Sequence, residues 1–386
     1  MAFEPRRPLF VVAVTTVVLL SLAGAHAQDA LPASISDAEF WALTERLSEP
    51  NGTFRSDNLL SNELALSSVA TQLAARAKPG GVYLGVGPEQ NFTYIAAMRP
   101  RIAFITDIRR GNLHMHLMYK ALFELSADRA EFVSRLFTKP RPSGLTGTST
   151  AADLMNAYWD IHTSAEAIYK TNLQAITDVL VKKHGFPLSA DDLSGIEYVY
   201  HAFYWFGPAI NYSSSTSGSI GGRTTYADLM MTVDAAGAER SYLATEENFR
   251  FLKTLHAKNL IVPVVGDFAG PKALRAVGDY LRERKSVVTA FYVSNVESYL
   301  TRGGLWPTFC ANVATMPIDD ETVFIRPSMS VTVFRGSGST PPTVQTGTAA
   351  PVTGRAGTLM TFISFTTSGS GRSPFGVVAE EVKSCR

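Results

Sequence analysis

The chain has 386 residues, of which 46% are hydrophobic and 18% are charged, and its formal net charge is +1. This composition predicts a folded globular protein, and the length allows a large core. A nearly neutral chain lacks the basic surface that binds nucleic acids or anionic membranes, so we expect neither as a partner.

The first predicted element is a cleavable signal peptide over residues 1–27. Two adjacent arginines form a basic start, an apolar run follows over residues 9–23, and Ala25-His26-Ala27 supplies small residues two positions apart. These are the three parts of a secretory signal, and the apolar run is shorter than the roughly 20 residues of a membrane span. We therefore expect a periplasmic or secreted protein. An uncleaved anchor is the alternative, and the paired arginines leave the twin-arginine export route open.

Residues 28–386 are predicted to form a single α/β domain with no stable membrane span. A capping box at Ser36 opens one helix, and a polar turn before Leu66 opens another. Apolar strand patterns then alternate with helical patterns over residues 82–87, 91–98, 102–107 and 112–126. This alternation with short joints is typical of a parallel, doubly wound sheet.

The middle of the chain, residues 127–230, breaks this rhythm. Its pattern is mostly helical, it becomes aromatic over residues 198–206, and it ends in a run rich in serine and glycine from Ser213 to Gly222. We predict an insertion or cap over the edge of the sheet. The aromatic residues serve a packed core on one interpretation and stack on a ligand on the other.

The strand patterns return near the C-terminal third of the chain. Two further parallel strands are predicted over residues 260–265 and 286–293, and later strands at an antiparallel C-terminal edge over 322–325, 331–334 and 360–365. The stretch 336–357 is rich in Gly, Ser, Thr and Pro, which predicts a long flexible loop. Cys310 and Cys385 are the only cysteines, and in an oxidising compartment they could form one disulfide; two unpaired thiols are the alternative.

Candidate ligand-binding residues lie where the predicted strands end. Gly85 and Gly87 close the first strand, and Asp107 closes the second, 20 residues after Gly87. Glycines let the backbone approach a ligand, and an acid in this position accepts ribose hydroxyls. The other polar candidates at this edge are Glu89, Asn91, Arg109, Asp267 and Asn295. A tight turn and ordinary helix caps are the alternative interpretation.

Glu89 limits which ligand the first glycine turn would accept. A charged Glu89 beside a pyrophosphate would be repulsive, so the turn disfavours NAD and FAD and tolerates a cationic or amino-acid-bearing ligand. The histidines do not suggest a metal site. His114 and His116 are two positions apart on a predicted helix, so they face different sides.

Three blocks of the sequence, 85–94, 104–112 and 119–126, resemble an uncharacterised bacterial family of methyltransferase-like Rossmann-fold proteins of unknown function. The resemblance covers about residues 36 to 335. It implies a class I methyltransferase-like, Rossmann-like sheet, a cleft near Gly85, Asp107 and Asn295, and S-adenosylmethionine as a candidate cofactor. The sequence departs from catalytic methyltransferases at Tyr83 and Glu89.

Two functions remain open at this point. The first is an exported protein of methyltransferase-like fold that binds a nucleoside-type small molecule such as S-adenosylmethionine. The second is a non-catalytic periplasmic binding or assembly protein that keeps the scaffold without the donor site. No catalytic residue is predicted, because the chain has no Gly-x-Ser-x-Gly elbow, no His-Glu-x-x-His motif and no phosphate-loop lysine.

Overall fold

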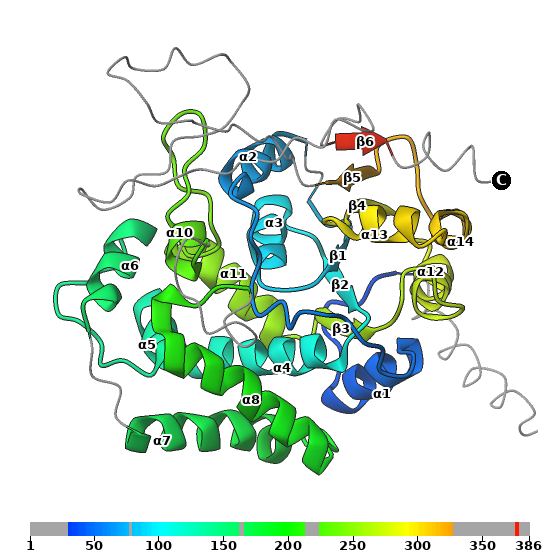
Figure 1. Ribbon diagram of the computed structural model, residues 1–386. Helices are drawn as coiled ribbons and strands as arrows, with labels where there is room; N and C mark the ends of the chain where they lie inside the picture. The colour runs from blue at the N-terminus through cyan, green and yellow to red at the C-terminus, as the bar shows by residue number, and fades with distance from the viewer. Residues whose placement is uncertain (1–29, 77–78, 162–165, 213–223, 327–374, 378–386) are drawn as a thin grey trace, which may run out of the picture.

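The computed structural model describes residues 30–76, 79–161, 166–212, 224–326 and 375–377. Its centre is a six-stranded sheet with the order β3-β2-β1-β4-β5-β6 (Figure 1). Strands β1 to β5 are parallel to one another, and β6 is antiparallel to β5. The strands are β1 Val82–Val86, β2 Ile102–Asp107, β3 Ile261–Val265, β4 Val288–Tyr292, β5 Val323–Ile325 and β6 Phe375–Val377.

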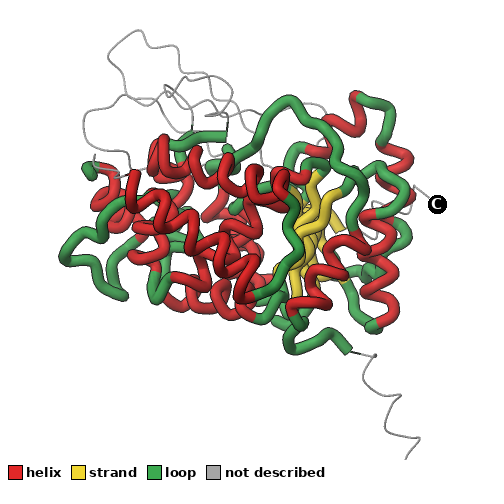
Figure 2. The backbone as a smooth tube through the Cα atoms, turned by 90° about the horizontal axis from the view of Figure 1, so that it is seen from below, coloured by secondary structure: helices red, strands yellow, loops and turns green. Residues whose placement is uncertain are grey.

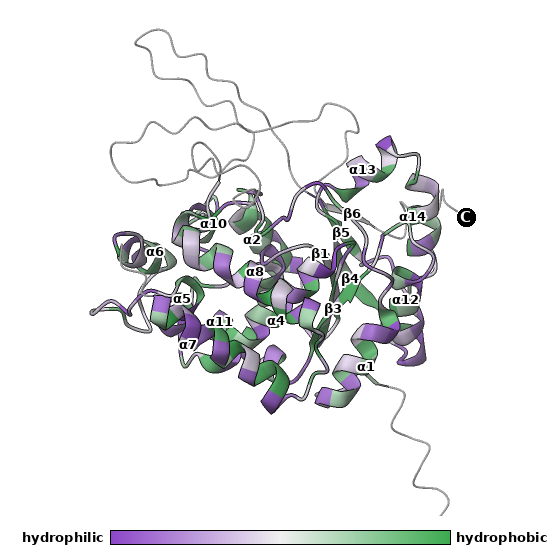
Figure 3. Cartoon of the chain, turned by 60° about the horizontal axis from the view of Figure 1, so that its bottom comes forward, coloured by the Kyte–Doolittle hydropathy of each residue, from purple (hydrophilic) through white to green (hydrophobic). Residues whose placement is uncertain are grey.

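Continuous apolar runs form the central strands. Every residue of β1, β2 and β3 is buried, and β1 reads Val-Tyr-Leu-Gly-Val. Strands of a parallel sheet that are covered on both faces have such runs rather than alternating polar residues. Figure 3 shows these strands in hydrophobic colours at the centre of the molecule. The four parallel strands predicted over residues 82–107 and 260–293 are therefore confirmed as strands.

Helices cover both faces of the sheet (Figure 2). On one face lie α3 (Gln90–Met98) and α4 (Arg110–Leu125), which pack on β1, β2 and β3. On the other face lie α12 (Ala273–Glu283) and α14 (Trp306–Val313), while α1 (Asp37–Leu47) packs along β3 and against α12. The remaining helices outside residues 127–230 are α2 (Leu66–Arg76), α11 (Glu246–Ala257) and α13 (Val296–Arg302).

The described part of residues 127–230 is mostly helical, as its pattern predicts. It contains α5 (Arg129–Phe137), α6 (Ala151–Trp159), α7 (Glu166–Thr177), the π-helix η1 (Asp178–Lys183), α8 (Ala190–Phe206), the 3-10 helix η2 (Gly207–Ala209) and α10 (Tyr226–Met230). Helix α8 packs along α4. Its aromatic residues divide between the two surfaces of the helix: Tyr200 and Phe203 are buried, whereas Tyr198 and Trp205 are 52% and 70% exposed.

The C-terminal edge of the sheet differs from the prediction. The pattern predicts residues 322–325 at an antiparallel edge, but β5 pairs in parallel with β4, with Ala290 opposite Val323. Strand β6, which the pattern does not predict, is the antiparallel neighbour of β5. Several predicted features lie outside the described residues, namely the signal peptide, the run 213–222, the segments 331–334 and 360–365, and the loop 336–357. Among the helices that the structure describes, none is long and apolar enough to span a membrane.

Candidate functional site

The carboxyl end of the parallel sheet is covered by residues 51–63, the segment between α1 and α2, which we call the strap (Figure 1). The strap contacts the turn after β2, where the Gly52 amide donates to the Ile108 carbonyl at 2.8 Å. It contacts the turn after β1, where the Ser61 amide donates to Glu89 Oε1 at 3.4 Å. Ligands of doubly wound sheets bind at this end of the strands, so the strap lies over the predicted cleft.

The structure places Asp107 beside Gly87, as the sequence predicts. A Cβ built on Gly87 would lie 3.9 Å from Asp107 Oδ2, and Gly87 has a φ of +74°, which favours glycine. The Asp107 carboxylate is engaged by Arg109, whose backbone amide and Nε donate to Oδ1 at 2.9 and 3.2 Å. Both side chains are largely buried. Arg109 Nη1 also donates to the carbonyl of Asp57 in the strap. The two predicted ligand residues, Asp107 and Arg109, thus pair with each other.

Asn91 fills the space that Gly85 leaves open. A Cβ on Gly85 would lie 1.9 Å from Asn91 Oδ1, so the glycine makes room for this amide. Asn91 Nδ2 donates to the carbonyls of Val86 and Pro88 at 2.9 and 2.6 Å, and its Oδ1 accepts from the Tyr83 hydroxyl at 2.9 Å. An amide of the same chain therefore occupies the space beside Gly85, and the role of Gly85 in a ligand loop stays a prediction.

Glu89 is fully buried, and its Oε2 has no hydrogen-bond partner among the described residues. Burial raises the pKa of Glu89 to about 8, which favours the uncharged carboxyl at neutral pH. An uncharged Glu89 would not repel a pyrophosphate, so the role of this residue toward a ligand stays a prediction.

A second carboxyl, the half-buried Glu63 of the strap, lies between β1 and β4, where the strand order reverses. It accepts hydrogen bonds from Tyr292 Oη at 2.7 Å, Ser294 Oγ at 2.6 Å and Gln90 Nε2 at 2.9 Å. Desolvation raises the pKa of Glu63, although these three hydrogen bonds oppose the shift. Nothing in the local sequence pattern around Glu63 indicates contacts with β4, so the sequence alone does not mark it as a site residue.

Asp267 and Asn295 make separate local contacts. Asp267 Oδ1 accepts from the Ala269 amide at 2.9 Å, which closes a turn after β3. The start of α12 is capped by Glu49, which accepts from the amides of Lys272 and Ala273, both at 2.7 Å. Asn295 is exposed at the N-cap position of α13 and makes no side-chain cap hydrogen bond. Within the described ranges, neither Asp267 nor Asn295 has a hydrogen bond or ion pair with the Gly87–Asp107 group.

The pockets lie beside the strap, at the start of α4. One of about 560 Å³ opens between α1, α4 and the start of α8, and includes Trp41, Arg110, His114 and Asp191. A smaller one of about 100 Å³ lies between Arg109 and α8. Neither pocket is predictable from the sequence, because segments far apart in the chain form each one.

Asp192 of α8 anchors a polar cluster in the wall of the larger pocket. Its Oδ1 accepts from Arg110 Nε at 2.6 Å and faces His114 Nε2 at 2.8 Å. Burial alone would raise the pKa of Asp192, but hydrogen bonds from Arg110 and His114 outweigh it and hold that pKa below its usual range. Burial lowers the pKa of His114, against the opposing influence of Asp192, and so favours the neutral ring.

The pair of His114 and Asp192 is not arranged as a general base. A Cβ built on Gly195 would lie 2.1 Å from His114 Nδ1, so the second ring nitrogen faces the backbone of α8 rather than the pocket. His116 lies on the other side of α4, where its Nε2 faces the Gly87 carbonyl at 2.9 Å. The two histidines therefore face different sides, as their spacing predicts. Across the described part of the chain, no group of three or more His, Cys, Asp or Glu residues could hold a metal ion.

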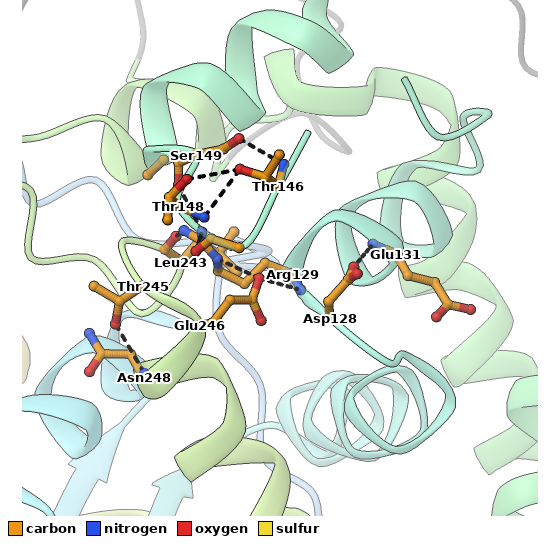
Figure 4. Close-up of polar contacts among 12 residues, drawn as sticks. Asp128, Arg129, Glu131, Thr146, Thr148, Ser149, Leu243, Thr245, Glu246 and Asn248 are labelled. Carbon is orange, nitrogen blue, oxygen red and sulfur yellow. Dashed lines mark hydrogen bonds and ion pairs between the residues drawn. The ribbon is translucent and has the colours of Figure 1, made fainter. Parts of the chain in front are cut away.

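A buried arginine forms a second polar cluster away from the sheet (Figure 4). Arg129, at the start of α5, donates to Glu246 Oε1 at 2.9 Å, to the Leu243 carbonyl at 2.6 Å and to the Ser149 carbonyl at 2.7 Å. These contacts join α5 to the start of α11 and to the loop before α6. Because its nitrogens point at groups of the chain itself, Arg129 has a structural role.

Cys310, on α14, is part of a disulfide bond. Cys385, the other cysteine of the sequence, lies outside the described residues.

Fold and site together define a class: an α/β protein with a parallel sheet whose carboxyl end is covered by its own chain. Residues 59–183 and 222–345 match the model of a family described as "Domain of unknown function (DUF7790)", and the chain belongs to that family. A comparison with curated proteins finds no match. The family match leaves out α1 and residues 184–221, which include α8.

Proposed function

We propose that this chain is an exported, non-catalytic binding protein that keeps a Rossmann-like scaffold without a working donor site. One observation carries the proposal: groups of the chain itself occupy the positions that a nucleoside ligand would use. They are Arg109 on Asp107, Asn91 against Gly85, and Glu63 between β1 and β4. A ligand would have to displace all three, and with them their hydrogen bonds.

The sheet topology supports the Rossmann-like and methyltransferase-like part of the proposal. The order β3-β2-β1-β4-β5, with helices on both faces, is that of doubly wound nucleotide-binding sheets. Doubly wound nucleotide-binding sheets also have an acid at the end of the second strand beside a glycine after the first, as Asp107 and Gly87 are here. Fold alone does not define an activity, and the occupied crevice argues against the donor chemistry.

Two features support export. The first 27 residues have the pattern of a signal peptide, and Cys310 is disulfide-bonded. Disulfides persist in oxidising compartments such as the periplasm. S-adenosylmethionine is made in the cytosol, so an exported catalyst would have no supply of that donor, which favours the non-catalytic function.

Calorimetric titration of residues 28–386 with S-adenosylmethionine and S-adenosylhomocysteine tests the proposal. We expect no binding by folded protein, and no difference in an Asp107→Ala variant, because Arg109 already engages this carboxylate. Micromolar binding that the Asp107→Ala variant loses would overturn the proposal and restore the nucleoside-binding function. Circular dichroism of both proteins checks that each is folded.

A further inference from the structure

The larger pocket has the size of a small-molecule site. Its volume of about 560 Å³ falls within the range of ligand pockets, roughly 300–1,000 Å³. Helix α1 supplies Trp41 and Glu45, the first turns of α4 supply Arg110 and His114, and the start of α8 supplies Asp191 and Asp192. Asn51, the first residue of the strap, also lines the pocket, and its Oδ1 accepts from the Arg110 amide at 2.7 Å.

The charges around the pocket do not balance. Three carboxylates line it, from Glu45, Asp191 and Asp192, against one guanidinium, from Arg110. Arg110 is shared, because its Nε contacts Asp192 at 2.6 Å and its Nη2 contacts Glu45 at 3.2 Å. Burial lowers the pKa of His114, which disfavours a positive charge on its ring. The lining carboxylates therefore outnumber the one guanidinium, an imbalance that attracts a cation and repels an anion.

Trp41 supplies an aromatic wall beside these acids. Its ring stacks on Phe186 with the centroids 5.6 Å apart and an interplanar angle of 26°. The stack with Phe186 holds the indole in place, and Trp41 is one of the residues that line the pocket. An indole face attracts a cation electrostatically, and such contacts are worth about 0.5–2 kcal/mol depending on how far the cation is desolvated.

We propose that this pocket binds a small organic cation, with an ammonium group held between the carboxylates of Glu45 and Asp191 and against the indole of Trp41. The inference rests on the proposed function as a binding protein and names its class of ligand. Asp192 lies deeper and keeps Arg110 and His114 in place, so it positions the wall rather than meeting the ligand.

Helix α1 and helix α8 lie outside the residues that match the family, whereas α4 lies within them. We therefore propose cation binding for this chain alone.

Choline and its uncharged isostere, 3,3-dimethyl-1-butanol, are matched probes for this site, with putrescine as a primary diamine. We expect calorimetry to detect submillimolar binding of choline or putrescine by the mature chain and none of the alcohol. The double variant Glu45→Gln and Asp191→Asn should weaken binding at least about tenfold. The variant Glu197→Gln removes another exposed carboxylate of α8 that does not line the pocket, and it should bind as the wild type does.

Three results would each exclude this cation site. They are failure of both amines to bind the folded chain, equal binding of the alcohol, and unchanged affinity in the double variant. If the amines fail and S-adenosylmethionine also fails, only the class of ligand is wrong and the proposed function stands. If S-adenosylmethionine binds through Asp107, the proposed function itself is wrong.

Discussion

The buried carboxyl of Glu89 should make the stability of this protein depend on pH. In an unfolded chain the carboxyl loses its proton near its ordinary pKa of 4.5, whereas burial raises the folded pKa to about 8. Between these values the folded state binds the extra proton, so the free energy of unfolding falls as pH rises. The slope from this one group approaches about 1.4 kcal/mol per pH unit.

Replacing Glu89 by Gln should remove this dependence, because glutamine has a similar shape and no charge at any pH. We expect urea unfolding to show Glu89→Gln more stable than the wild type at about pH 8, with the difference shrinking toward about pH 5. His116 acts in the opposite direction, because burial lowers its pKa to about 4, but it is present in both proteins and cancels. Glu247→Gln is the control, because the Glu247 carboxylate is 83% exposed. If the free energy of unfolding of Glu89→Gln changed with pH in parallel with that of the wild type, the prediction would be contradicted.

At the scale of elements, the pocket depends on how closely α8 packs on α4. Gly195 permits this approach, because a Cβ there would lie 2.1 Å from His114 Nδ1 and 2.4 Å from Cε1. Where a new Cβ has open space around it, replacing a helical Gly by Ala raises the free energy of unfolding by up to about 1 kcal/mol. At Gly195 the His114 ring must move and lose its contact with Asp192, so we expect Gly195→Ala to destabilise the protein by about 1–3 kcal/mol in chemical denaturation.

Gly111 offers a matched control on the partner helix. It lies in α4, and nothing is within 4 Å of a Cβ built there, so Gly111→Ala should be neutral or stabilising. A stabilising Gly195→Ala of the same size would mean that α8 does not pack on α4 as described. Loss of choline binding in a Gly195→Ala protein that is still folded would show in addition that the pocket depends on this contact.

At the scale of the whole molecule, export predicts a defined N-terminus and a defined disulfide. Expressed with its full sequence in a bacterial host, the protein should appear in the periplasmic fraction and begin at residue 28. Peptide mapping without reduction should recover Cys310 joined to Cys385, the only other cysteine. A cytoplasmic chain that keeps residues 1–27 and has two free thiols would contradict the proposal.

The sequence by itself determined which segments form the central strands, and that the carboxyl ends of these strands lie at one edge of the sheet. Unbroken apolar runs such as Val82–Val86 are typical of strands in a sheet covered on both faces, and parallel strands bring their carboxyl ends to one edge. For that reason the neighbourhood of Gly87 and Asp107 was predictable from spacing alone. The opposite orientations of His114 and His116 were predictable in the same way, because helical periodicity places them on different sides.

Only the tertiary structure decided what fills the site. Glu63 meets Tyr292, and Trp41 and Asp192 line one pocket, across stretches of sequence that have no local pattern in common. Whether Glu89 faces a ligand or the interior depends likewise on packing around it and not on its neighbours in the chain. Periodicity and propensity describe a residue's own segment, whereas burial, pKa and pockets arise from groups that meet only after folding.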